Sequence, residues 1–128
     1  ISGKKEKKYA ELMVDELAIK CVSIWQPVRA MSGGNKQKVV FGKWIADDAD
    51  ILILDCPTRG VDIGVKASMY QLIYDMKKRG KSIIMISEEM PELTGMADRL
   101  LIMKDGKING EFFRKDGYHE HELIECMI

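Results

Sequence analysis

Apolar residues recur at helical spacing in three long stretches of the chain. The first covers Glu6–Ile19, and the second follows Ser32, with apolar positions at i+3, i+4, i+7 and i+8 from Gln37. The third covers about Ile63–Arg79. Ser32 and Asp62 precede the second and third stretches, and both residue types commonly cap helix N-termini. The pattern therefore predicts three amphipathic helices, two of them with a side-chain cap.

Short apolar runs between these helices predict β-strands. Ile51–Leu54 is continuously apolar and ends at Asp55, as in a strand that is buried on both faces of a parallel sheet. Ser82–Ile86 and Arg99–Met103 are the next two apolar runs, and Lys104–Lys107 contains a hairpin turn. The alternation of strands and helices predicts an α/β fold with a parallel sheet. The other expected elements are a short helix from Pro91 to about Met96, a strand at Ile108–Phe113 and a last helical turn around Leu123–Met127.

The part before the first predicted strand is helical only. We therefore expect residues 1–47 to form part of a small helical subdomain in front of the sheet. Residues 48–128 are expected to form the sheet-containing part, with a terminal hairpin and a tail. A chain of 128 residues is long enough to build a hydrophobic core.

Composition narrows the possible classes. Lys plus Arg number 20 and Asp plus Glu number 20, and this balance argues against a nucleic-acid binder. No apolar run approaches the roughly 20 residues that span a bilayer. Cys21, Cys56 and Cys126 are far apart and have no CxxC spacing, so we expect neither disulfides nor a zinc site, and a cytoplasmic location.

Two short segments could bind a nucleotide. Ser32-Gly33-Gly34 opens a helix, where exposed N–H groups at the positive end of the helix dipole can receive a phosphate oxygen. The alternative is an ordinary capped helix. Asp55 follows a buried strand, where ligands of α/β sheets bind, and its carboxylate could bind Mg²⁺. The alternative is a carboxylate that caps a loop amide.

The order of these segments resembles the ABC family of ATP-binding cassettes. Met31–Gln37 stands where the family has its LSGGQ signature, Ile51–Asp55 matches the Walker B strand, and Thr58–Asp62 matches the D-loop. A closer similarity, to the second cassette of the tandem ATPases of bacterial monosaccharide importers, rests on three segments: Ser32–Lys38, Arg59–Asp62 and Ser87–Glu92. The resemblance extends over about residues 8–113.

The resemblance implies a P-loop NTPase-like fold and a role for each matching residue. In ABC dimers, ATP lies between the Walker motifs of one cassette and the signature of the other. Asp55 would serve Mg²⁺ at this cassette's own site, and Asp62 would bridge the dimer interface. The residues expected at the ATP of the partner cassette are Ser32, Gly33, Gly34, Asn35 and Gln37.

The sequence departs from the family pattern in three ways. No GxxxxGK[ST] loop occurs, so the chain is expected to be a truncated piece of a longer protein and to bind neither ATP nor Mg²⁺ tightly alone. Cys56 stands where the family has a catalytic glutamate, and a thiol substitutes poorly for it. Ser87 stands where many cassettes have a phosphate-sensing histidine. We therefore expect weak hydrolysis at this cassette's own site.

The resemblance favours one function over its alternatives. The full-length protein would be the transport-coupled ATPase of an importer for simple sugars, working with a partner cassette and with permease subunits at the cytoplasmic membrane. A degenerate regulatory cassette is the first alternative. A non-transport ABC ATPase of DNA maintenance is the second, although such proteins carry long coiled coils before the signature. A non-ABC α/β binding module is the third.

Overall fold

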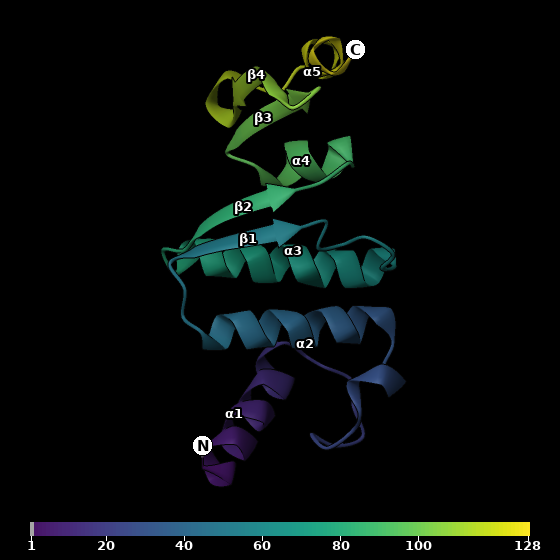
Figure 1. Ribbon diagram of the computed structural model, residues 1–128, viewed down its shortest axis with the longest axis vertical. Coiled ribbons are helices and arrows are strands. Elements are labelled where there is room, and N and C mark those ends of the chain that lie inside the picture. Colours follow the sequence, from purple (N-terminus) through teal and green to yellow (C-terminus); the bar gives the residue numbers. More distant parts are fainter. Residues whose placement is uncertain (1) are drawn as a thin grey trace. The chain divides into compact units, whose positions relative to one another are not determined.

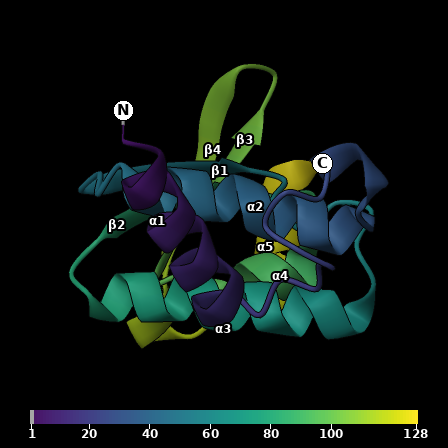
Figure 2. The same cartoon turned by 90° about the horizontal axis from the view of Figure 1, so that it is seen from below.

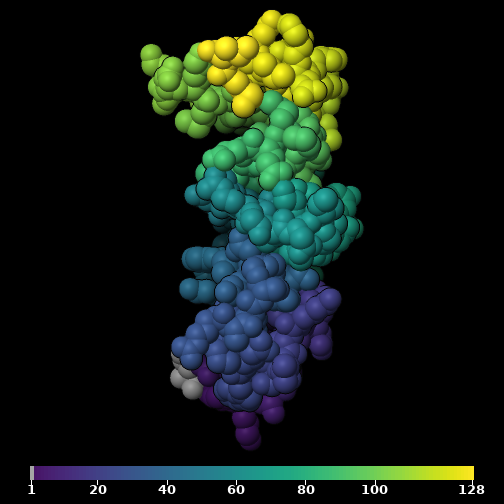
Figure 3. All heavy atoms as spheres, turned by 90° about the vertical axis from the view of Figure 1, so that its right-hand side faces the viewer, coloured from purple at the N-terminus to yellow at the C-terminus, as the bar shows by residue number. Residues whose placement is uncertain are grey.

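The computed structural model of the chain describes residues 2–128, and contacts group these residues into two units. The first unit extends to Ile84, and the second covers Met85–Ile128. In Figure 3 the first unit is coloured from purple to teal and the second from green to yellow. The division that the sequence suggests between residues 47 and 48 stays a prediction.

Helices and strands alternate along the chain as the apolar pattern predicts, and the predicted strand at Ser82–Ile86 has the bounds that were expected. The first helix begins three residues earlier than expected and ends at Glu16. In chain order the elements are α1 (Gly3–Glu16), η1 (Val28–Ala30), α2 (Gly33–Ala46), β1 (Ile51–Asp55), α3 (Ile63–Lys78), β2 (Ser82–Ile86), α4 (Met90–Met96), β3 (Arg99–Lys104), β4 (Lys107–Phe113), η2 (Arg114–Asp116) and α5 (Glu120–Met127).

In the first unit, α1 packs against α2. Figures 1 and 2 show α2 and α3 side by side, with α1 crossing α2 at a steep angle. Met13, Leu17 and Ile19 form a buried apolar cluster beneath this crossing. The crossing is close because a glycine, Gly42, faces α1, and the hydroxyl of Tyr9 donates a hydrogen bond to the Gly42 carbonyl at 2.6 Å.

The strand β1 is paired with β2, and the arrows of both strands point the same way in Figure 1. The sequence predicted that β1 is buried on both faces, and this prediction was wrong for the described residues. Leu52 and Leu54 are buried, whereas Ile51 and Ile53 are 61% and 68% exposed. One face of β1 packs on helices, and no second layer covers the other face within the described part of the chain.

The second unit is built on the hairpin of β3 and β4. The two strands are antiparallel, and Asp105-Gly106 forms the turn with both residues at positive φ, as a two-residue hairpin turn requires. The register shifts between Ile102 and Met103. Leu123 of α5 is fully buried against the hairpin. The turn, the two strands and the helix at the C-terminus all lie where the sequence predicted them.

None of the helices within residues 2–128 is both long enough and apolar enough to cross a membrane.

A cluster of charges joins Lys81, the residue before β2, to the loop before β1. The Nζ of Lys81 lies 2.7 Å from the carboxylate of Asp48 and 3.6 Å from that of Asp50. The hydrogen bond from Lys81 lowers the pKa of Asp48, and the same hydrogen bond raises the pKa of Lys81. The pair therefore stabilises the fold only while both groups are charged.

The variant Lys81→Gln should be less stable than the parent protein near neutral pH. Because the pKa of Asp48 is lowered in the fold, its contribution is present above about pH 4 and is lost as the pH falls. The contribution of Lys81 is lost as the pH rises above about 10.4. Urea unfolding at low salt should show a stability difference that shrinks at both extremes. The exposed Lys36→Gln is the control, and an equal pH dependence in both variants would contradict the pairing.

Candidate functional site

The N-terminus of α2 carries the side-chain cap that the sequence predicted. The Ser32 hydroxyl accepts hydrogen bonds from the Asn35 backbone N–H at 3.4 Å and from the Asn35 side-chain amide at 2.9 Å. The Asn35 side-chain oxygen in turn accepts from the backbone N–H of Lys20 at 2.9 Å. Ser32 and Asn35 therefore fix the first turn of α2 to the loop that follows α1.

The two glycines of this helix start have different surroundings. A Cβ added to Gly33 would meet nothing within 4 Å, so its backbone is open to an approaching ligand. A Cβ added to Gly34 would lie 2.6 and 2.8 Å from the two γ-carbons of Val65, in the first turn of α3. Gly33 therefore leaves space at the surface for a ligand to approach its backbone, whereas Gly34 lets the N-termini of α2 and α3 approach each other.

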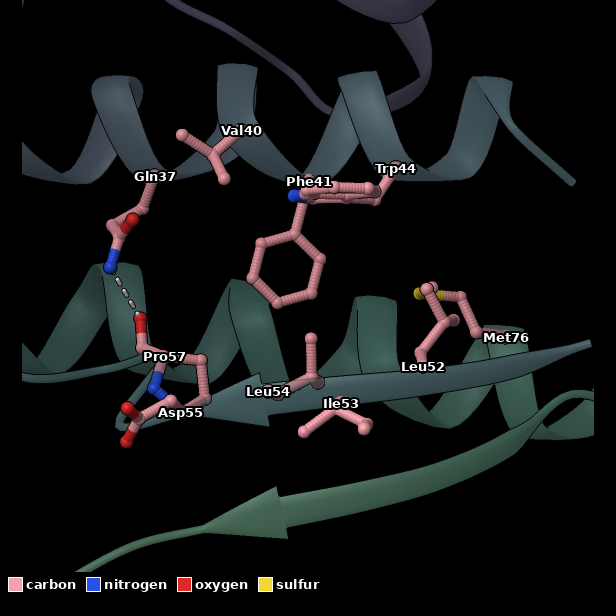
Figure 4. A pocket seen from close by; sticks show the side chains of 10 residues that line it. All are labelled: Gln37, Val40, Phe41, Trp44, Leu52, Ile53, Leu54, Asp55, Pro57 and Met76. Atoms are coloured by element: carbon pink, nitrogen blue, oxygen red, sulfur yellow. Dashed lines mark hydrogen bonds between the residues drawn. The ribbon is translucent and has the colours of Figure 1, made fainter. Parts of the chain in front are cut away.

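A hydrogen bond joins α2 to the loop after β1. The side-chain amide of Gln37 donates to the carbonyl of Pro57 at 3.0 Å, as the dashed line in Figure 4 shows. The same view shows the Asp55 carboxylate beside Pro57, at the end of β1. The signature segment and the loop that follows the Walker B strand thus form one connected region of the first unit.

Asp55 has the surroundings that a magnesium ligand needs. It is the last residue of β1 and is exposed, and no described residue forms an ion pair or hydrogen bond with its carboxylate. The described residues contain no group of three or more His, Cys, Asp or Glu side chains that could enclose a metal ion. A single carboxylate fits Mg²⁺, because this ion usually keeps several waters and phosphate oxygens as its other ligands.

The loop between β1 and α3 has a constrained backbone. Cys56 is half-buried and has a φ of 44°, in the left-handed region that costs a non-glycine residue roughly 1–2 kcal/mol. The side chain of Thr58 is fully buried, which fixes the middle of the loop. The Asp62 carboxylate accepts a hydrogen bond from the Val65 N–H at 3.0 Å, so Asp62 caps α3 as predicted. The loop therefore presents Cys56 and Asp62 from fixed positions.

A hollow between α2 and β1 lies next to these residues. It has a volume of about 180 Å³ and is lined mainly by apolar side chains, among them Phe41, Trp44 and Leu54 (Figure 4). Ligand sites usually measure roughly 300–1,000 Å³ and have several polar groups. The hollow is therefore a packing gap between helix and strand, and the candidate site is the polar region at its end.

Ser87 lies in the second unit, and β1, α3 and β2 separate it in the chain from α2, which carries the signature. It follows β2 directly, and its hydroxyl donates a hydrogen bond to the carboxylate of Glu92 in α4. The backbone N–H of Glu89 donates to the same hydroxyl at 3.1 Å. Ser87 is thus half-buried in a hydrogen-bonded turn that links β2 to α4.

The structure adds residues that the sequence did not single out for a role. The close contact with Val65 explains why position 34 is a glycine. The carbonyl of Pro57 accepts a hydrogen bond from the Gln37 side chain. Glu92 gives Ser87 a partner. The sequence showed Ser87–Glu92 only as a segment similar to the family. Glu92 stands out among the acidic residues because its carboxylate is buried, which is unusual. Burial cannot be seen in the sequence.

Comparisons with known proteins give relatives of one kind. The chain is 46% identical over 120 residues to the ribose import ATP-binding protein of Oceanobacillus iheyensis, covering 94% of this chain and 24% of the relative. It is 49% identical over 118 residues to the L-arabinose transport ATP-binding protein of Geobacillus stearothermophilus, covering 92% and 23%. The chain thus spans about a quarter of the length of these curated relatives. No family model matches the chain.

Solved structures give the fold. A dimeric ATP-binding cassette bound to ADP and Pi superposes with a TM-score of 0.77 at 21% identity, over 88% of this chain and 49% of that chain. Another ATP-binding cassette of an ABC transporter superposes with a TM-score of 0.79 at 20% identity, over 100% and 51%. The resemblance seen in the motifs is thus confirmed. The chain is similar over nearly its whole length to ATP-binding proteins of bacterial sugar importers, and its fold is that of about half of an ATP-binding cassette. The chain belongs to the ABC family of ATP-binding cassettes.

Proposed function

We propose that this chain works within the ATP-binding subunit of an ABC importer for simple sugars, where it supplies the signature segment to ATP bound by a partner cassette. The names of the relatives, ribose import and L-arabinose transport ATP-binding proteins, support transport of a sugar over a role in DNA maintenance. Because the chain spans about a quarter of these relatives, the activity belongs to the longer protein.

The start of α2 is the observation that carries this proposal. The Ser32 cap fixes the first turn, and Gly33 leaves its backbone open on the outside. Unpaired N–H groups and the helix dipole together attract a phosphate at such a terminus. Asn35 and Gln37 stabilise the segment through hydrogen bonds with the Lys20 N–H and the Pro57 carbonyl, and these bonds hold the signature in one conformation.

The cassette's own nucleotide site would be assembled differently. Asp55 would bind Mg²⁺, which shields the phosphate charges of ATP, and Asp62 would lie at the interface with the partner cassette. Cys56 supplies no carboxylate to orient and deprotonate the attacking water. We therefore expect this site to bind Mg·ATP and to hydrolyse it slowly. A cassette that mainly regulates its partner is the second candidate function, and Cys56 is the observation that favours it.

The remaining parts of the proposal concern assembly. Residues 1–47 would belong to the helical subdomain and residues 48–128 to the ATPase core. The tandem partner cassette would complete both ATP sites, and permease subunits would bring the protein to the cytoplasmic face of the membrane. Neither nucleic acid nor a membrane-inserted segment of this chain has a place in this assembly.

The variant Gly33→Asp should abolish most ATP hydrolysis by the full-length protein and leave its fold intact. The new side chain points into open space, and a carboxylate near a helix N-terminus is favourable for the fold. A carboxylate about 4 Å from a phosphate costs on the order of 4 kcal/mol at an effective dielectric of 20. The steady-state hydrolysis rate of the purified transporter should fall at least about tenfold.

The variant Gly33→Asn is the matched control, because asparagine has the shape of aspartate without its charge. It should lower the rate much less than Gly33→Asp does. Equal rates in the two variants would show that no anion binds at Gly33. A large loss of thermal stability in Gly33→Asp would point to a structural role of Gly33 and would contradict its open surroundings.

A further inference from the structure

The contacts of the Asn35 side-chain amide determine which end of it faces which neighbour. The backbone N–H of Lys20 only donates hydrogen bonds, and its nitrogen lies 2.9 Å from one end of the amide. That end is therefore the oxygen, Oδ1. The other end, the Nδ2 donor, then lies 2.9 Å from the hydroxyl oxygen of Ser32. The half-buried amide is thus held in one orientation, with its donor toward Ser32.

These contacts also determine where the Ser32 proton points. A serine hydroxyl has one proton to donate and two lone pairs that accept. Both lone pairs are used within the first turn of α2, by the Asn35 side-chain amide at 2.9 Å and by the Asn35 backbone N–H at 3.4 Å. Nothing among residues 2–128 accepts the Ser32 proton. Because Ser32 is exposed, its proton is directed away from the helix, toward solvent.

The segment that orients the amide lies before the signature, at residues 18–20, and two hydrogen bonds hold it to α2. The first joins the Lys20 N–H to Asn35. The second joins the Nζ of Lys38, one turn further along α2, to the Ala18 carbonyl at 3.2 Å. Both bonds lie within the first unit. The Lys20 N–H therefore stays in place beside the Asn35 oxygen.

We propose that Asn35 is a positioning residue: its two N–H contacts occupy the lone pairs of Ser32, so that the hydroxyl presents a donor to the γ-phosphate of ATP bound by the partner cassette. The inference deepens the proposed function and rests on it, because it takes that ATP to face the start of α2. Phosphate oxygens are negatively charged acceptors, and a proton that already points outward meets them without reorientation. Asn35 thus acts on ATP through Ser32.

Aspartate at position 35 reverses this arrangement with little change of shape. One carboxylate oxygen still accepts from the Lys20 N–H, and the other accepts the proton of Ser32. The hydroxyl is then turned inward and offers the phosphate no donor. The new charge also repels the phosphate, and this second effect does not depend on Ser32. A double-mutant cycle with Ser32→Ala separates the two effects.

The experiment measures kcat/KM for Mg·ATP and the inhibition constant of Mg·ADP in the purified full-length protein, in Asn35→Asp, in Ser32→Ala and in the double variant. Asn35→Asp should lower kcat/KM about tenfold more when Ser32 is present than in the Ser32→Ala background, the effect of one hydrogen bond to a charged group. Inhibition by ADP should show no such coupling, because ADP lacks the γ-phosphate. A disturbance of α2 itself would weaken the binding of both nucleotides.

Two further variants serve as controls. Asn35→Leu keeps the bulk of the side chain but lets the Ser32 hydroxyl turn among its three staggered positions. It should lower kcat/KM about threefold, again only when Ser32 is present, and it tests the inference even if Asn35→Asp does not fold. Lys38→Met removes the other hydrogen bond of segment 18–20 and leaves the Asn35 amide facing Ser32. It should show no coupling to Ser32→Ala.

The outcomes separate the inference from the function on which it rests. If Ser32→Ala and the parent protein have equal kcat/KM, or if the losses in Asn35→Asp and Ser32→Ala simply multiply, the inference is wrong. Equal coupling for ADP would also overturn it, because the effect would then be structural. The pair Gly33→Asp and Gly33→Asn tests the proposed function without Asn35, and equal rates in that pair would contradict the proposed function itself.

Discussion

Replacing Gly34 by alanine should lower the free energy of unfolding by about 1–3 kcal/mol, although alanine is normally the better helix former. The new Cβ would lie 2.6 and 2.8 Å from the γ-carbons of Val65 and 3.2 Å from its Cβ. Valine is branched at Cβ and has few rotamers, so it cannot turn its methyl groups aside. The first turns of α2 and α3 must therefore move apart, which urea unfolding of the purified protein should detect.

A double-mutant cycle gives this prediction its control. In a Val65→Ala background the space for the new methyl group exists, so Gly34→Ala should be neutral or stabilising there. Gly33→Ala, one residue earlier in the same turn, meets no atom within 4 Å and should not destabilise the protein. An equal loss in both Val65 backgrounds would show that the cost comes from the backbone of α2 and not from the contact.

The contact between Gly34 and Val65 also bears on function. Moving α2 away from α3 would displace the signature segment from the loop that ends at Asp62. A fall in ATP hydrolysis in Gly34→Ala that Val65→Ala reverses would therefore indicate positioning. The family resemblance assigned Gly34 to the phosphate of a partner's ATP, and the structure gives it a second, internal reason to be glycine.

The local structure was predictable because it depends on neighbours in the chain. Ser32 and Asp62 cap α2 and α3 through hydrogen bonds that reach three residues ahead, so residue type and position sufficed to identify them. Asp105-Gly106 likewise contains its own turn. The roles that the resemblance assigned to the site residues stay predictions.

What the sequence could not predict depends on groups that are distant along the chain. The continuous apolar run of β1 suggested burial on both faces, yet Ile51 and Ile53 are exposed, because burial depends on which layers are present. The hydrogen bond between Gln37 and Pro57 joins residues 20 positions apart, and no local sequence pattern predicts it. The burial of the Glu92 carboxylate, which is 4% exposed, likewise has no local sequence signal.

Replacing Cys56 by glutamate in the full-length protein should increase ATP hydrolysis at this cassette's own site by about a hundredfold or more, the usual contribution of a positioned general base. Cys56 already has a Cβ and a φ of 44°, so glutamate adds no new backbone strain at this position. The exposed carboxylate of Asp55, the preceding residue, is where we propose that Mg²⁺ binds. Hydrolysis should be measured with the P-loop lysine of the other cassette replaced, so that only this site contributes.

Cys56→Gln is the matched control, because glutamine has the size of glutamate but cannot accept the proton of the attacking water. It should leave hydrolysis as slow as in the parent protein. If glutamate and glutamine gave equal rates, the missing carboxylate would not be what limits this site. If sugar import then rose with the hydrolysis rate of Cys56→Glu, the site would be an impaired half of the motor. Faster hydrolysis with unchanged or lower import would instead favour a regulatory site, in which slow turnover at Cys56 keeps ATP bound while the partner site works.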